Sequence, residues 1–85
     1  MLKIKDNVDL KELEKYGYSY DDFNECWNKE ITEDVEISIF EGTKYISIIY
    51  FDYEGDYVEK DDFDEEKLEY IDDLIKADLV KGLEE

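Results

Sequence analysis

The sequence contains no histidine, no arginine and no proline, and it has a single cysteine, Cys26. Without histidine, acid–base catalysis would depend on carboxylates, Tyr or Lys, and Cys–His nucleophiles are excluded. Cys26 cannot form a disulfide within the chain, and we expect it to be a small apolar residue, buried or half-buried, beside Trp27. The lack of proline agrees with uninterrupted, paired strands.

Long hydrophobic runs are also missing. The opening Met-Leu-Lys-Ile-Lys-Asp lacks the apolar run of a signal peptide, and no stretch approaches the length that spans a bilayer. A strong negative charge also opposes binding to anionic lipid surfaces. Together with the lone thiol, these features predict a cytoplasmic protein that does not interact with membranes.

Positive charge is scarce. The chain has 27 Asp and Glu but only 10 basic residues, all Lys, which gives a net charge of −17. Residues 1–51 have a net charge of −6, and residues 52–85 have a net charge of −11. Such self-repulsion destabilises a compact state, so we expect stability to rise with salt, which screens it. The net negative charge also argues against direct binding of nucleic acid.

Apolar residues are abundant enough to build a core. Hydrophobic residues make up 42% of the chain and aromatic residues 15%, whereas a disordered acidic chain has few aromatics. Eighty-five residues fit one domain, spanning residues 1–85. Dimerisation would add stability, but nothing in the sequence requires it.

The start of the chain carries the signature of a short helix. Asp9 is a good N-cap with Glu12 three residues later, and Val8 and Leu13 occupy the two positions of a hydrophobic staple. Gly17 is placed to end the helix. We therefore predict about two helical turns after Asp9.

The middle of the chain is typical of β-structure. Residues 23–31 alternate loosely, and Val35, Ile37 and Ile39 alternate cleanly with polar residues. A turn at residues 41–43 favours a hairpin into the apolar run 44–51, the expected central strand. Tyr57 and Val58 are expected to return as a short strand.

A longer helix is predicted over residues 64–77. Asp64 is its expected N-cap, and Leu68, Ile71, Leu74 and Ile75 form one apolar stripe at helical spacing. Residues 78–83 fit either a last helical turn or a terminal strand. The predicted fold class is therefore α+β, with a small antiparallel sheet of three to four strands, a short N-terminal helix and a longer C-terminal helix.

Both ends of the chain carry a resemblance. Leu-Lys-Ile-Lys-Asp-Asn-Val-Asp-Leu-Lys-Glu-Leu-Glu-Lys-Tyr-Gly-Tyr at residues 2–18 and Ile-Asp-Asp-Leu-Ile-Lys-Ala-Asp-Leu-Val at 71–80 resemble the ends of small uncharacterised phage and prophage proteins of low-GC Gram-positive bacteria. The resemblance implies a mobile-element origin and a small α+β fold, without implying an activity or site residues. Position 78 is Asp where a helix-ending Gly is expected, which argues against the terminal-strand alternative.

The usual signatures of chemistry are missing. There is no Gly-rich phosphate loop, Ser-His-Asp set or Cys/His zinc spacing. Asp52-x-Glu54-Gly55-Asp56 has its Gly at the fourth position, whereas an EF-hand loop needs it at the sixth. We therefore predict no enzyme activity, no metal site and no cofactor.

Acidic residues are densest between residues 52 and 73. On the predicted helix, Glu65, Glu69, Asp72 and Asp73 fall opposite the apolar stripe, and Tyr53 and Tyr57 are interleaved with acids before it. Carboxylates at this spacing can imitate the phosphate rows of a duplex. The candidate partner-binding residues are Asp52, Tyr53, Glu54, Asp56, Tyr57, Glu59, Asp61, Asp62, Glu65, Glu66, Glu69, Asp72 and Asp73.

These observations favour a noncatalytic inhibitor from a mobile element, a DNA mimic that occludes the basic nucleic-acid channel of a host defence protein such as a CRISPR effector nuclease. In size and charge the chain is similar to anti-CRISPR proteins and other phage DNA mimics. The alternative is an acidic interaction or assembly module whose charge serves solubility. A sponge for a nucleotide signal is disfavoured, because phosphates would be repelled.

Overall fold

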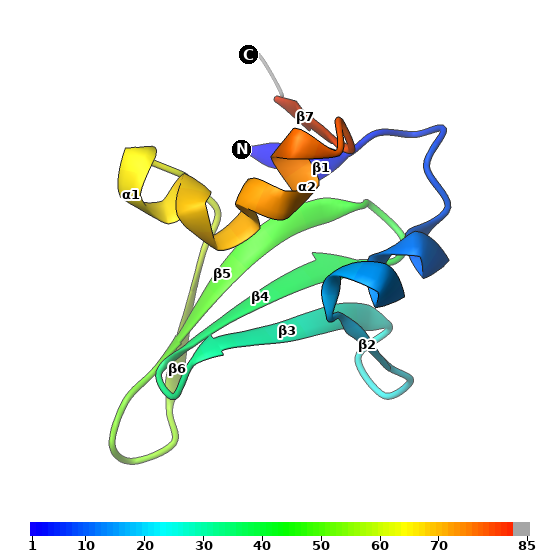
Figure 1. The fold of residues 1–85 in the computed structure, drawn as a ribbon. Coiled ribbons are helices and arrows are strands. Elements are labelled where there is room, and N and C mark those ends of the chain that lie inside the picture. The colour runs from blue at the N-terminus through cyan, green and yellow to red at the C-terminus, as the bar shows by residue number, and fades with distance from the viewer. Residues whose placement is uncertain (83–85) are drawn as a thin grey trace.

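A computed structural model describes residues 1–82 as one antiparallel sheet of seven strands, with helical segments along one face (Figure 1). The elements in chain order are β1 (Leu2–Ile4), the 3₁₀ helix η1 (Leu10–Tyr16), β2 (Ser19–Asp21), β3 (Cys26–Thr32), β4 (Val35–Phe40), β5 (Tyr45–Phe51), β6 (Tyr57–Lys60), α1 (Glu65–Leu68), the 3₁₀ helix η2 (Glu69–Ile71), α2 (Asp72–Lys76) and β7 (Val80–Gly82).

The sheet order is β2-β3-β4-β5-β1-β7, and β6 also pairs with β5. On one side β5 pairs with β4 along most of its length. On the other side its first residues pair with β1, and Ile48–Phe51 pair with β6. Because β7 pairs with β1, the two ends of the described chain lie side by side (Figure 1).

The α+β prediction is wrong: the fold is mostly β. Three strands were not predicted or were left open, namely β1, β2 and β7, and each has only three residues. Three residues are too few to show the alternation by which a strand is recognised. Their pairing is also decided by distant segments of the chain.

The predicted long C-terminal helix is broken into α1, η2 and α2. Its start is as predicted, because the Asp64 side chain accepts a hydrogen bond from the Lys67 N–H at 3.0 Å. The break falls at Ile71, whose backbone leaves the helical region at φ −124° and ψ 22°. We call residues 65–76 the broken helix.

The predicted N-terminal helix has the expected ends but a different geometry. Asp9 accepts a hydrogen bond from the Lys11 N–H at 3.0 Å, and Gly17 ends the segment with φ 92°. The turns between them are 3₁₀ rather than α. Capping residues mark where a helix begins and ends, and they do not fix its pitch.

The terminal segment is a strand over Val80–Gly82; residue 83, the last of the undecided stretch, lies outside the described residues. Asp78 takes the left-handed conformation (φ 61°) expected of a helix-ending Gly. Asp tolerates this conformation better than most residues. Its carboxylate also forms an ion pair with Lys5 at 2.7 Å, which helps to hold β7 beside β1.

The core lies between the sheet and the helical segments. Alternation in β4 and β5 directs Ile37, Ile39, Ile46 and Ile48 towards this covered face, as the sequence pattern predicted for β4. The fully buried side chains are Ile4, Leu13, Ile37, Ile39, Ile46, Ile48, Ile71 and Leu74. The core therefore depends on η1 and the broken helix as well as on the strands.

Lys29 ties the sheet to the broken helix. It lies on the covered face of β3, opposite Ile37. Its ammonium group forms an ion pair with Asp73 at 3.2 Å and lies 5.6 Å from the ring centroid of Tyr18. A cation within about 6 Å of an aromatic face is attracted to it. Lys29 therefore interacts both with Tyr18, just before β2, and with Asp73 of the broken helix.

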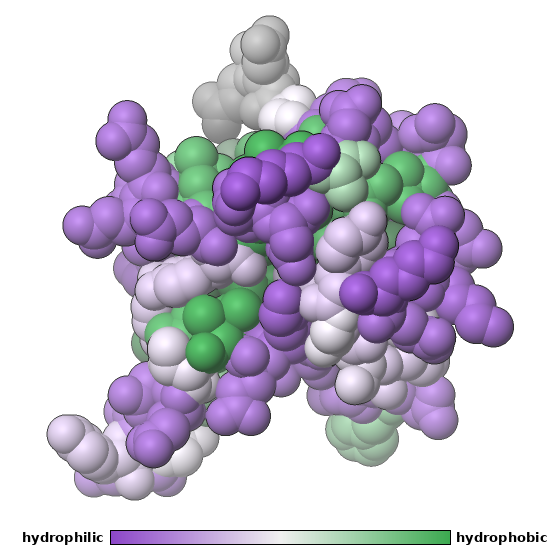
Figure 2. Space-filling model, viewed as in Figure 1, coloured by the Kyte–Doolittle hydropathy of each residue, from purple (hydrophilic) through white to green (hydrophobic). Residues whose placement is uncertain are grey.

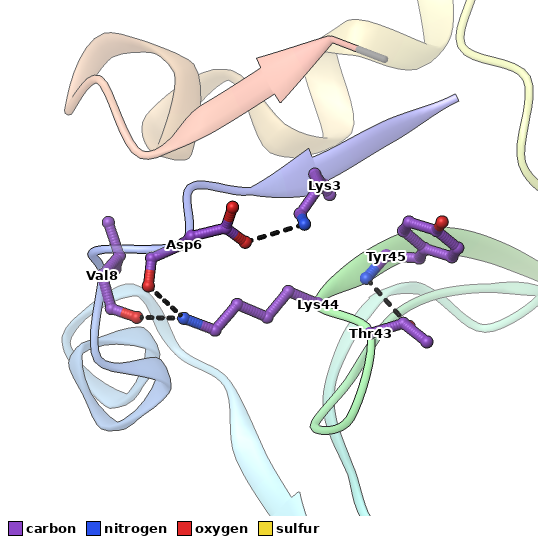
Figure 3. Close-up of polar contacts among 6 residues, drawn as sticks. All are labelled: Lys3, Asp6, Val8, Thr43, Lys44 and Tyr45. Atoms are coloured by element: carbon purple, nitrogen blue, oxygen red, sulfur yellow. Dashed lines mark hydrogen bonds and ion pairs between the residues drawn. The ribbon is translucent and has the colours of Figure 1, made fainter.

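Lys44 ties the β4–β5 turn to the segment after β1 (Figure 3). Its ammonium group donates hydrogen bonds to the carbonyl oxygens of Asp6 at 2.9 Å and Val8 at 2.8 Å. The Asp6 carboxylate in turn pairs with Lys3 at 2.8 Å, which lowers the pKa of Asp6 below its ordinary value. The Lys44 ammonium group is therefore hydrogen-bonded to backbone carbonyl groups rather than to a carboxylate.

Candidate functional site

The acidic residues of the predicted partner-binding set are exposed, except for Asp73, which is half-buried. They do not form one continuous row. Those of residues 52–56 lie at the tip of the β5–β6 hairpin, and those of residues 65–73 lie on the broken helix. Figure 1 places the two groups at opposite ends of β6. Figure 2 shows hydrophilic side chains over both places, with an apolar patch between them.

The ion pairs leave every glutamate within residues 1–82 without a lysine partner, together with several aspartates. Every ion pair of a lysine within residues 1–82 is made with an aspartate, and none is made with a glutamate. On the broken helix, Asp72 pairs with Lys76 at 2.8 Å and Asp73 pairs with Lys29. Lys67 lies 3.8 Å from both Asp62 and Asp64. Among residues 61–73, the acids without a lysine partner are therefore Asp61, Glu65, Glu66 and Glu69.

The hairpin tip is ordered by its own aspartate. One carboxylate oxygen of Asp52 accepts hydrogen bonds from the backbone N–H groups of Glu54 at 2.9 Å and Asp56 at 3.0 Å. Gly55, with φ 86°, allows the tight turn. Tyr53 is fully exposed at the tip. The tip thus presents an aromatic ring among carboxylates.

Asp61 and Asp62 lie in the connection between β6 and α1. The other two predicted residues, Tyr57 and Glu59, belong to a different surface. In β6 they pair with Phe51 and Ile49, which point away from the core. The register therefore places them on the face of the sheet opposite η1 and the broken helix. We call this the uncovered face.

A hollow of about 380 Å³ lies on the uncovered face, and sequence reasoning did not predict it. Its lining alternates along β3, β4, β5 and β6 with the residues that face the core. The lining residues are Asp21, Asn24, Cys26, Asn28, Glu36, Ser38, Phe40, Ile49, Phe51, Tyr57 and Glu59. Cys26 and Ile49 are buried beneath it and are separate from the main core.

Hydrogen bonds fix the polar floor of the hollow. The Asn28 side-chain oxygen accepts hydrogen bonds from the Ser38 hydroxyl at 2.7 Å and from the Cys26 thiol at 3.3 Å. The Ser47 hydroxyl donates to Glu59 at 3.1 Å. Burial raises the pKa of the Cys26 thiol. The thiol is therefore a weak nucleophile, as expected for a buried structural cysteine.

Two carboxylates of the hollow differ in their environment. Asp21 accepts hydrogen bonds from the Asn24 side chain at 2.8 Å and from the backbone N–H groups of Phe23 and Asn24, which lower its pKa. The pKa of Glu36 is raised, first by burial and then by the negative charges of Glu30 and Asp21. Glu30 lies directly opposite Glu36 in the β3–β4 ladder, and like charges in that position destabilise a sheet.

Replacing Glu36 with Gln is expected to stabilise the fold at neutral pH by about 0.2–1 kcal/mol, because it removes this repulsion. A carboxyl whose pKa is raised on folding destabilises the fold when ionised, and the penalty disappears once the pH falls below its ordinary value of 4.5. The gain should therefore vanish in acid. Urea unfolding at neutral and acidic pH measures it, with the exposed Glu33→Gln as control. Equal stabilities of wild type and Glu36→Gln at neutral pH would contradict this account.

Within residues 1–82 no group of three or more His, Cys, Asp or Glu side chains is arranged to hold a metal ion. In the same part of the chain, no helix has both the length and the apolar character needed to cross a membrane. Comparison with protein-family models, with curated proteins and with solved structures found no match to the chain.

Proposed function

We propose that this chain is a noncatalytic, DNA-mimicking inhibitor of mobile-element origin that occludes the basic nucleic-acid-binding channel of a host defence protein, such as a CRISPR effector nuclease. The observation that carries the proposal is the set of glutamates without a lysine partner. Glu65, Glu66 and Glu69 are exposed side by side on the broken helix, while the lysines of residues 1–82 that form ion pairs form them with aspartates.

The spacing of these acids supports the proposal. Residues three and four apart on a helix lie about 5–6 Å apart, so Glu65, Glu66 and Glu69 form a compact anionic group. Asp52, Glu54 and Asp56 at the hairpin tip add a second group. A protein that grips a dense row of phosphates through lysines and arginines would meet a similar field here. Complementary fields of this kind speed association and fix orientation.

Affinity capture from a host lysate tests the proposal, with the bound fraction eluted by a salt gradient and, in parallel, by duplex DNA. We expect a basic nucleic-acid-binding protein, released by moderate salt and by DNA, because screening weakens exposed charge interactions. If the captured proteins are neither basic nor displaced by DNA, the proposal is wrong.

The exposed edge of the sheet supports the alternative, an acidic interaction or assembly module. Tyr57 and Val58 of the edge strand β6 are 65% and 56% exposed, and an unpaired edge can accept another strand. A partner bound in this way would be held by backbone hydrogen bonds and apolar contacts. Its release would therefore need denaturant rather than salt, which separates the two functions in the same capture experiment.

A further inference from the structure

The hollow on the uncovered face has the features of a receptor for a cationic side chain. We infer that it receives an arginine side chain of the partner protein, which docks with its guanidinium group on Glu36 and its stem against the aromatic wall. The inference rests on the proposed function in one respect: the partner is a basic protein. It adds a specific anchor to an interaction that charge alone would leave diffuse.

The carboxylates make the hollow complementary to a cation. Glu36, Asp21 and Glu59 line it, and no lysine does. Asp21 and Glu59 already accept hydrogen bonds from Asn24 and Ser47. No side-chain hydrogen bond or ion pair involves Glu36 within residues 1–82. A guanidinium group offers two parallel N–H donors that match one carboxylate, and such charge-assisted pairs are strong.

The arrangement opposite Glu36 adds to this argument. Glu30 and Glu36 lie directly across from each other in the β3–β4 ladder, with no lysine to separate their charges. A cation bound at Glu36 would relieve that repulsion. Binding energy and relief of repulsion then act in the same direction, so the bound state gains more than an isolated ion pair at the surface would give.

The walls favour arginine over lysine. The rings of Phe51 and Tyr57 lie 6.2 Å apart at 54° to each other, beside Phe40 and above the buried Ile49. A planar guanidinium group is weakly hydrated and stacks on aromatic rings, whereas an ammonium group is strongly hydrated. The volume of about 380 Å³ is at the small end for ligand sites, which suits one long side chain.

Other occupants fit the charge less well. A second copy of this chain would bring Glu36, Asp21 and Glu59 against the same three carboxylates, and a nucleic acid would be repelled by them. Lys3 and Lys81, which lie on this side of the sheet, are register neighbours in the β1–β7 ladder. Neither of them lines the hollow. A protein segment that carries arginine together with an apolar residue satisfies both the carboxylates and the aromatic wall.

A titration followed by ¹⁵N-resolved NMR tests the inference on the full chain. The probes are N-acetyl-arginine methylamide and, for comparison, N-acetyl-lysine methylamide. We expect saturable shifts at the amides of Asn28, Ser38 and Ile49, with affinity for the arginine probe at least about fivefold higher. Glu36→Gln should reduce the arginine affinity by about tenfold, the effect of losing one charged partner worth about 1.4 kcal/mol, and Glu33→Gln should leave it unchanged. The same spectra report whether each variant is folded.

Two results would overturn the inference. One is a set of shifts that does not saturate or that follows residues 65–69 instead of the hollow. The other is an arginine affinity that is the same in Glu36→Gln and in wild type. If the probe fails while the captured partner is basic and displaced by DNA, the anchor is wrong and mimicry stands. If the probe binds while capture yields no basic protein, the hollow is an arginine site and the proposed function is wrong.

Discussion

Reversing the charge of Glu65, Glu66 and Glu69 to Lys should weaken binding of the captured basic partner by about 100-fold or more at low salt. These three residues are exposed and have no lysine partner, so the substitution removes free charge without breaking an ion pair of the fold. Electrostatic complementarity of this kind changes association rates by about 10- to 1,000-fold. Surface plasmon resonance over a range of salt concentrations measures the effect.

A triple variant elsewhere on the surface provides the matched control. Glu12→Lys, Glu14→Lys and Glu33→Lys change the net charge by the same amount, at exposed positions on η1 and the β3–β4 turn. If binding depends on the position of the charge, this variant should keep most of its affinity. Equal losses in both variants would show that only total charge matters, and would contradict a surface centred on the broken helix.

Replacing Leu74 with Ala should destabilise the protein by about 2–5 kcal/mol, the range for a fully buried leucine. Leu74 is 0% exposed and, with Ile71, it fastens the broken helix to the sheet. The pieces of this helix have only four, three and five residues, and isolated helices of this length are not stable in water. Their structure therefore depends on packing.

Urea unfolding measures this effect, and Ile75→Ala is the control because Ile75 is 40% exposed on the same segment. We expect the control to lose well under half as much stability as Leu74→Ala. A Leu74→Ala protein as stable as its Ile75→Ala counterpart would mean that the helix contributes little to the core. For a domain of this size a loss of several kcal/mol is a large part of total stability.

The local signals in the sequence were informative wherever the structure is decided locally. Asp9 and Asp64 cap their helices and Gly17 takes the left-handed conformation, as their residue types predicted. The alternation of Val35, Ile37 and Ile39 identified the core side of β4. The predicted continuous helix over residues 64–77 was wrong, because the backbone leaves the helical region at Ile71. Ile71 and Leu74 of its apolar stripe still belong to the core.

Long-range pairing could not be predicted in the same way. β1 and β7 come from the two ends of the chain and pair over three residues, so neither shows a pattern by itself. The hollow depends on the same kind of information. Glu36, Ile49 and Glu59 are neighbours only through the β4–β5 and β5–β6 registers. The sequence indicates acidic density, but it does not show which acids share a face.

The sequence did contain one signal for the hollow, which is the partly apolar character of the uncovered face. Ser47, Ile49 and Phe51 alternate with the core residues of β5, and a face exposed only to water would not need Ile and Phe there. Together with Phe40 in β4, they indicate a surface that is shielded in part. The acids of residues 52–56 and 65–69, by contrast, were predicted as exposed and lie exposed.

Competition with duplex DNA for the captured partner tests the central claim most directly. Fluorescence anisotropy of a labelled duplex bound to the partner would be followed while this protein is added at several salt concentrations. A DNA mimic should displace the duplex completely, with an apparent affinity that falls steeply as salt increases. A ternary complex, in which the duplex stays bound at saturating protein, would contradict it.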